Sequence, residues 1–215
     1  MMYRWLLALL VVLLLPLSVQ GEAKAFQDSF GVDEKNFVST GKNDFFILEP
    51  GYQLTYEGES DGEKSVLVIT VLNETKKVAN VETRVVEERE TAAGQLTEIS
   101  RNYFAIDKTT NNIYYFGEDV DDYKDGKVVG HGGGWLAGEK GAKYGLMMAA
   151  APKVGERHYQ EVAPGVALDR AEIVSTDETV KTPAGKFEKC LKVKETSGLN
   201  PKEKEYKYYA PGVGL

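Results

Sequence analysis

The densest group of chemically active side chains in this sequence is an acidic run at residues 118–125. Calcium takes several oxygen ligands that one short segment can supply, so carboxylates at this density suggest a calcium site. The spacing is not that of an EF-hand, because a tyrosine stands at the third ligand position counted from Asp121 and Gly132 stands at the closing one. The candidate metal ligands are Asp119, Asp121, Asp122 and Asp125.

The same acidic run has a second interpretation. Asp125 and Gly126 form a dipeptide typical of a tight hairpin turn, and a solvated hairpin needs no metal. On the first interpretation the chain is a structural or adhesive surface protein with a calcium-stabilised loop. On the second, which the spacing favours, the protein has no cofactor.

A glycine-rich passage and the segment after it carry the second group of candidates, Trp135, Tyr144, Met147 and Met148. The composition of residues 139–151, followed by Pro152, predicts a short helix. Methionine adapts to irregular ligands, so we expect these four side chains to line a site for an apolar or lipid-like ligand. The alternative is that the helix only fills the concave face of the sheet on which it packs.

The two histidines, His131 and His158, lack the sequence partners that catalysis would need. Three glycines follow His131, as in the oxyanion loop of lipases, but the chain has no G-x-S-x-G nucleophile turn. It also has no H-x-x-H, H-E-x-x-H or C-x-x-C spacing for a metal. The sequence therefore predicts a protein that is not an enzyme, and an enzyme would require a buried cluster of a histidine with carboxylates.

These candidates must be positioned by strands, which the pattern predicts from Phe45 onward. Short apolar or alternating runs are separated by turn signals at residues 49–51, 59–62, 107–112 and 182–185. Consecutive strands at hairpin spacing favour an antiparallel meander. The predicted fold class is mainly β, a curved antiparallel sheet or open half-barrel of about eight to ten strands with one short packed helix. The residues expected on its solvent side include Glu82, Arg84, Glu98 and Arg101.

The sequence divides into three segments. Residues 1–25 have the charged start, apolar run and small-residue cleavage sites of a signal peptide, and the apolar run is shorter than the roughly 20 residues of a membrane span. An uncleaved N-terminal anchor is the alternative. Residues 26–44 form a lead-in segment with a short helix expected near residues 32–37, and residues 45–215 form a single β-rich domain.

The net charge of −7 bears on partners and location. An acidic protein lacks the basic surface with which proteins bind nucleic acid or anionic membranes. We therefore expect no nucleic-acid partner and no membrane span after signal cleavage. The expected location is the periplasm or the exterior of the cell.

The last third of the chain resembles a group of exported bacterial β-rich proteins. The shared pattern is P-A-G-x-F, here residues 183–187, a Leu-Lys-Val strand at 191–193, and Y-A-P-G-V-G at 209–214. It is similar to periplasmic proteins of the TapB type and more distantly to half-barrel lipoprotein carriers of the LolA type. The resemblance implies a curved antiparallel sheet, and it supplies no catalytic residues to carry over.

Together these patterns predict an exported, non-enzymatic binding protein. Its expected partner is an apolar or lipid-like ligand, or another protein, held on the concave face of the sheet.

Overall fold

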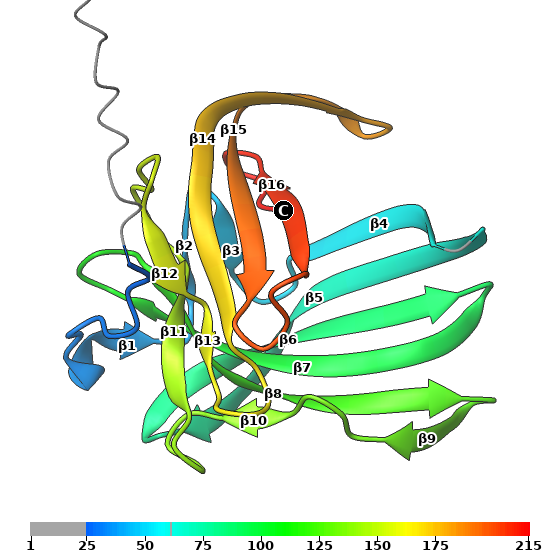
Figure 1. Cartoon of the computed structure of the whole chain (residues 1–215), viewed down its shortest axis with the longest axis horizontal. Helices are drawn as coiled ribbons and strands as arrows, with labels where there is room; N and C mark the ends of the chain where they lie inside the picture. The colour runs from blue at the N-terminus through cyan, green and yellow to red at the C-terminus, as the bar shows by residue number, and fades with distance from the viewer. Residues whose placement is uncertain (1–24, 61) are drawn as a thin grey trace, which may run out of the picture.

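The computed structural model describes residues 25–60 and 62–215, which fold mainly as antiparallel strands (Figure 1). The predicted signal peptide at residues 1–25 lies, except for Ala25, outside the described residues. No helix in the described part of the chain is long and apolar enough to cross a membrane.

One short 3-10 helix and sixteen strands make up the described residues. The helix is η1 (Glu34–Asn36). The strands are β1 (Phe37–Val38), β2 (Gly41–Asn43), β3 (Phe46–Leu48), β4 (Gln53–Ser60), β5 (Glu63–Val78), β6 (Val81–Ala92), β7 (Gln95–Asp107), β8 (Ile113–Lys124), β9 (Lys127–Gly130), β10 (Trp135–Leu136), β11 (Lys143–Met148), β12 (Arg157–Tyr159), β13 (Glu161–Val162), β14 (Asp169–Thr182), β15 (Gly185–Ser197) and β16 (Lys204–Tyr209).

The strands form a curled ten-stranded sheet that makes a half-barrel, with two smaller sheets beside it. The main path of the large sheet is β13-β11-β8-β7-β6-β5-β4, and β1, β9 and β10 pair at its side. A four-stranded sheet has the order β12-β14-β15-β16, and β2 pairs with β3. The mainly β half-barrel is therefore confirmed, and the four-stranded sheet is an additional layer.

Tight turns fix the register of the long hairpins. The β8–β9 connection is Asp125-Gly126, with φ angles of 53° and 72°, and Lys124 pairs with Lys127 across it. Two consecutive residues at positive φ match the right-handed twist of the flanking strands. The hairpin predicted at this dipeptide is confirmed.

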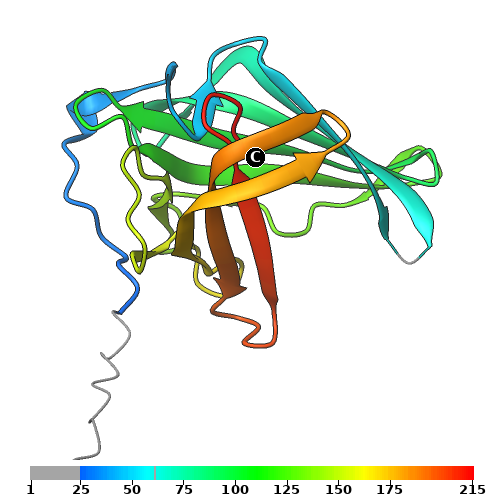
Figure 2. The ribbon, with the colours of Figure 1, turned by 90° about the horizontal axis from the view of Figure 1, so that it is seen from above.

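The ten-stranded and four-stranded sheets meet at only one end of the half-barrel. Figures 1 and 2 show the four-stranded sheet standing against that end, whereas the hairpins β4–β5, β6–β7 and β8–β9 project beyond it. We call the face of the ten-stranded sheet that is turned toward the four-stranded sheet the inner face. The opposite face is the outer face.

The core is centred on the first half of β8, which is buried on both sides. Residues 113–116 are each at most 5% exposed. On the outer face, Phe37 of β1 contacts the rings of Tyr114 and Phe116 at 5.4 and 5.1 Å between centroids. The predicted lead-in segment is thus paired with the sheet, since β1 is hydrogen-bonded to β7.

The helix predicted at residues 139–151 is wrong, because residues 143–148 are strand β11. Lys140 and Gly141 turn the chain with φ angles of 48° and 83°, and β11 then pairs with β8 and β13. Gly145 has no Cβ, which lets the carbonyl of Gln160 approach closely. This approach of the chain between β12 and β13 outweighs the local helical composition.

Arg84 was expected in solvent but is buried at 6% exposure. Its guanidinium donates to the carbonyl of Ser39 at 3.0 Å and to Thr40 Oγ1 at 2.7 Å. It also donates to the carbonyl of Glu74 at 3.2 Å. The connection between β1 and β2 covers this end of β6, so the charge is satisfied by hydrogen bonds instead of by water.

We predict that Gly145→Ala destabilises the protein by at least about 2 kcal/mol, because the new Cβ would lie 2.2 Å from the carbonyl oxygen of Gln160. Gly58→Ala in β4 is the matched control, since nothing lies within 4 Å of its Cβ position. Its effect should stay within about 0.5 kcal/mol. Chemical denaturation of both variants measures the difference, and equal stabilities would show that β11 and β13 are not packed as described.

Candidate functional site

A cavity of about 370 Å³ lies between the inner face of the large sheet and β16. The volume is near the lower end of the range of about 300–1,000 Å³ usual for small-molecule sites. Two larger pockets lie beside His131 and His158 and have more polar linings. Of these three, the cavity under β16 is the one whose walls are mainly apolar.

The apolar wall comes from alternate residues of neighbouring strands. Leu54 of β4 pairs with Ile69 of β5, so their side chains lie next to each other on the inner face. Val71 of β5 pairs with Val86 of β6 in the same way. The other apolar side chains of the cavity are Phe45, Phe46, Ile47, Tyr52, Leu67, Phe104, Met147, Tyr209, Val213 and Leu215.

Charged groups also line the cavity, from β6 beside the apolar wall and from β16 opposite it. Its lining includes Glu88, Glu90, Glu205 and Lys207. The ammonium of Lys207 lies 2.6 Å from a carboxylate oxygen of Glu195 and 3.2 Å from one of Glu205. Burial alone would lower the pKa of Lys207, but Tyr209 and these carboxylates raise it. The lysine is therefore held as a cation by the protein itself.

Two further carboxylates lie on the inner side near β10. The indole Nε1 of Trp135 donates to Glu161 Oε2 at 2.9 Å. Burial, reinforced by the charge of Glu118, raises the pKa of Glu161 to about 8. Burial also raises the pKa of Glu118 to about 7. Both carboxyl groups therefore exchange their protons near neutral pH, whereas an unperturbed glutamate is fully ionised there.

The four predicted ligand-binding residues do not form one site. Met147 lines the cavity, and Trp135 points to Glu161 on the inner side. Trp135 and Met148 belong to the buried core. Tyr144 is partly buried against that core and stacks on Phe116 at 5.0 Å between ring centroids. Because β11 is a strand, successive side chains face opposite sides, which separates Met147 from its neighbours.

The four predicted metal ligands are also divided. Asp119 accepts from Lys76 Nζ at 2.7 Å, and Asp121 lies 2.9 Å from His131 Nδ1. Asp122 faces the other way and accepts from the backbone of Gly132 at 3.1 Å. Asp125 is in the hairpin turn. Among the residues that the structure describes, no group of three or more histidine, cysteine or acidic side chains is arranged to hold a metal ion.

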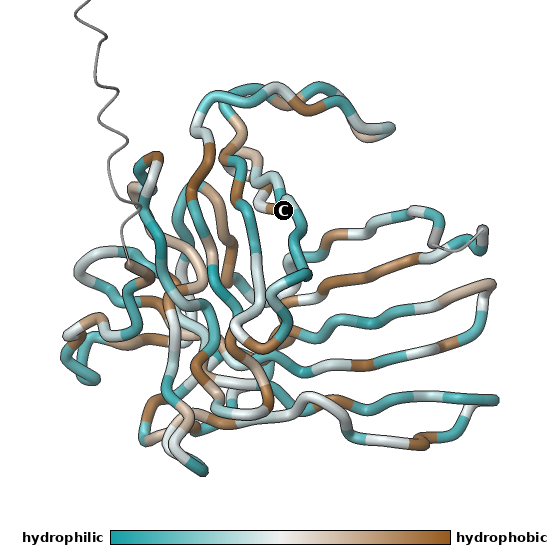
Figure 3. The backbone as a smooth tube through the Cα atoms, in the orientation of Figure 1, coloured by the Kyte–Doolittle hydropathy of each residue, from teal (hydrophilic) through white to brown (hydrophobic). Residues whose placement is uncertain are grey.

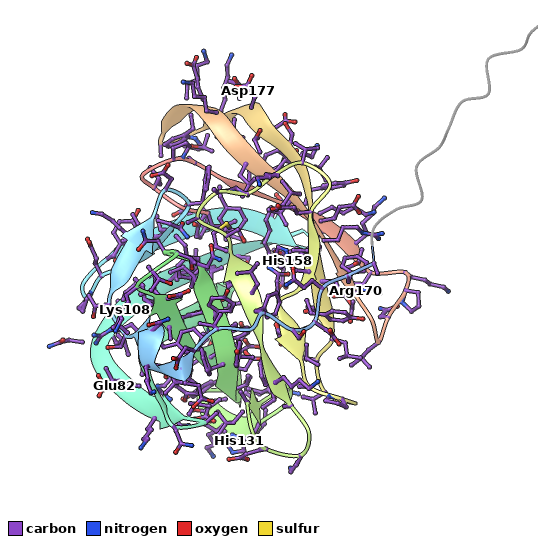
Figure 4. All side chains as sticks on the ribbon, turned by 90° about the vertical axis from the view of Figure 1, so that its left-hand side faces the viewer. Glu82, Lys108, His131, His158, Arg170 and Asp177 are labelled. Atoms are coloured by element: carbon purple, nitrogen blue, oxygen red, sulfur yellow. The ribbon has the colours of Figure 1, made fainter. Side chains whose placement is uncertain are left out.

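The histidines lie in separate parts of the molecule (Figure 4). His131 is exposed and His158 is 5% exposed. Burial lowers the pKa of His158 to about 4, and its Nε2 has no hydrogen-bond partner within the described chain. The structure does not bring the two histidines together.

The sequence prediction missed most of the cavity. Glu98, expected in solvent, faces inward, because it pairs with Glu90, which lines the cavity. Figure 3 shows the contrast, with a hydrophobic stretch on β5 beside a more hydrophilic projecting part of β6. Residues 65–72 are apolar on both faces of β5, and only the position of β16 showed that the face with Leu67 and Ile69 is the inner one.

We predict that Glu161 makes the protein lose stability as pH rises from about 5 to about 8. The pKa of Glu161 is about 8 in the folded protein against an ordinary 4.5, so the folded state retains a proton that the unfolded state has lost. Glu161→Gln should remove much of this slope, on the order of 2 kcal/mol. Urea denaturation at several pH values measures it.

The control for that series is Glu139→Gln, which replaces an exposed carboxylate in the turn before β11. It should leave the pH dependence as in the parent protein. A parent protein whose stability is flat or rises between about pH 6.5 and pH 8 would contradict the assignment of a raised pKa to Glu161; below that range the lowered pKa of His158 acts in the opposite direction.

Comparison of the chain with protein-family models, with curated proteins and with solved structures found no match.

Proposed function

We propose that this chain is an exported, non-enzymatic protein that binds an apolar or lipid-like ligand in the cavity under β16. The observation that carries the proposal is the combination of a largely apolar wall with a volume of about 370 Å³. Exposed apolar surface of this extent often marks a binding site. A concave, mainly apolar cavity is the usual form of a small-molecule site.

The position of the cavity also supports binding. The four-stranded sheet stands at one end of the half-barrel, and the hairpins project beyond it (Figure 1). There Glu90 of the inner face is exposed to solvent. A ligand could therefore enter along β4–β6 without opening the core at β8. The C-terminal residues close one side, since Tyr52 Oη donates to the carbonyl of Val213 at 2.6 Å.

The proposed export rests on the sequence of residues 1–25, and the proposed kinship with half-barrel carriers rests on the motifs of residues 183–214. A carrier of this kind would hold its ligand by shape and apolar contact, with no bond made or broken.

The direct test is native mass spectrometry of the protein purified gently from its own compartment. We expect an adduct of lipid mass that is lost on solvent extraction. A calcium-sized adduct lost to chelator would instead support the calcium-loop alternative.

We predict that Leu54→Trp abolishes binding of the neutral fluorescent probe N-phenyl-naphthylamine, because the larger ring fills the cavity from β4. Thr55→Trp is the matched control: it is the next residue of the same strand, it is exposed, and it points to the outer face. Binding should fall at least about tenfold for the first variant and remain unchanged for the second. Equal binding by both variants, or no binding by the parent protein, would show that the cavity is not the binding site.

A further inference from the structure

The inner face carries a row of carboxylates across three neighbouring strands. Glu90 of β6 is the direct cross-strand partner of Glu98 of β7. Glu98 is in turn the direct partner of Asp122 of β8. Direct partners of like charge in a sheet repel each other. Glu88, two residues before Glu90 and on the same face, extends this row into the cavity.

These inner carboxylates lack the cations that the outer face supplies. On the outer face, Asp119 pairs with Lys76 at 2.7 Å, and Arg101 lies 3.4 Å from Glu87 and 3.7 Å from Asp121. Within the described residues, Glu88, Glu90 and Glu98 have no hydrogen bond and no ion pair. The same strands therefore carry ion-paired carboxylates on the outer face and carboxylates without an ion pair on the inner face.

Withdrawal from water makes this arrangement costly. Burial raises the pKa of Glu88, against a smaller opposite effect of Lys207. Burial also raises the pKa of Glu98, reinforced by the charges of Glu90 and Asp122. An unpaired carboxylate in such a place stabilises neither the strand pairing nor the core. A cation from outside the protein would supply the missing partner.

The cavity has no free positive charge to offer an anion. Lys207 is the cation among the described residues that line it, and that lysine is already within 3.2 Å of Glu205 and 2.6 Å of Glu195. A fatty acid or phospholipid anion would have to break these pairs and approach Glu88 and Glu90. Charge complementarity thus points away from an anionic ligand.

We propose that the ligand of this cavity is a single-chain amphiphile with a cationic head group. The apolar chain lies against Leu54, Leu67 and Ile69, and the head group lies over Glu88, Glu90 and Glu98. This inference rests on the proposed function, because it specifies the chemistry of the ligand that the cavity holds. The row of carboxylates selects the charge of the head group, and the apolar wall accommodates the hydrocarbon chain of the ligand.

The test compares three amphiphiles that share a dodecyl chain, each below its micelle concentration. Dodecyltrimethylammonium is cationic, dodecyl maltoside is neutral and dodecyl sulfate is anionic. We expect the cationic amphiphile to bind at least about tenfold more tightly than the neutral one in isothermal titration, and the anionic one more weakly than both. The preference should shrink as salt is added.

The variant that isolates the head-group site is the double substitution Glu88→Gln and Glu90→Gln. It removes repulsion, so the variant should fold at least as well as the parent. The tenfold preference for the cation should disappear while the neutral amphiphile still binds. Glu87→Gln is the matched control, since Glu87 is adjacent in β6 and points to the outer face beside Arg101, and it should keep the preference.

The outcomes separate this inference from the proposed function. If no amphiphile of any charge binds the parent protein, the cavity is not a ligand site and both proposals fail. If the neutral or anionic amphiphile binds as well as the cationic one, the apolar site stands and the cationic head group is refuted. A preference that survives the double substitution would also refute it.

Discussion

The burial of the first half of β8 on both of its faces is the constraint on which the rest of the structure depends. Four consecutive apolar or aromatic residues, 113–116, cannot be hidden by one layer, because successive side chains of a strand point to opposite sides. The N-terminal segment covers the outer side through Phe37, and Phe104 and Trp135 contact Tyr115 on the other side. The segments that pack on the sheet are therefore concentrated at the end that holds residues 113–116. The inner face of the projecting hairpins stays accessible to solvent.

That uneven cover accounts for the electrostatics of the inner face. Where the sheet is packed, a buried charge such as Arg84 is satisfied by several backbone and side-chain acceptors. Further along the same strands, Glu88 and Glu98 are partly withdrawn from water without such partners. Folded proteins usually violate the rules of charge pairing where they bind something, and they offset the cost elsewhere in the core. Here the packed end of the half-barrel provides that stability.

Local chemistry gave reliable predictions where a short segment decides its own structure. The Asp125-Gly126 turn is one example, since few dipeptides adopt two positive φ angles with so little strain. The segment at residues 139–151 is the opposite case. Its composition favours a helix, yet the close approach of Gln160 to Gly145 makes it a strand. No local signal indicates a contact between residues that meet only because β13 returns beside β11.

The sequence by itself determined that this is a mainly β chain, with its principal turns and the alternation along its strands. These features depend on backbone preferences and on period-two patterns that are local. The tertiary structure decided which of the two faces is the inner one. An alternating strand presents two faces and does not say which will be covered, so Glu98 and Arg101, both expected in solvent, lie on opposite sides. The position of the four-stranded sheet, set by contacts between distant segments, made one face a cavity.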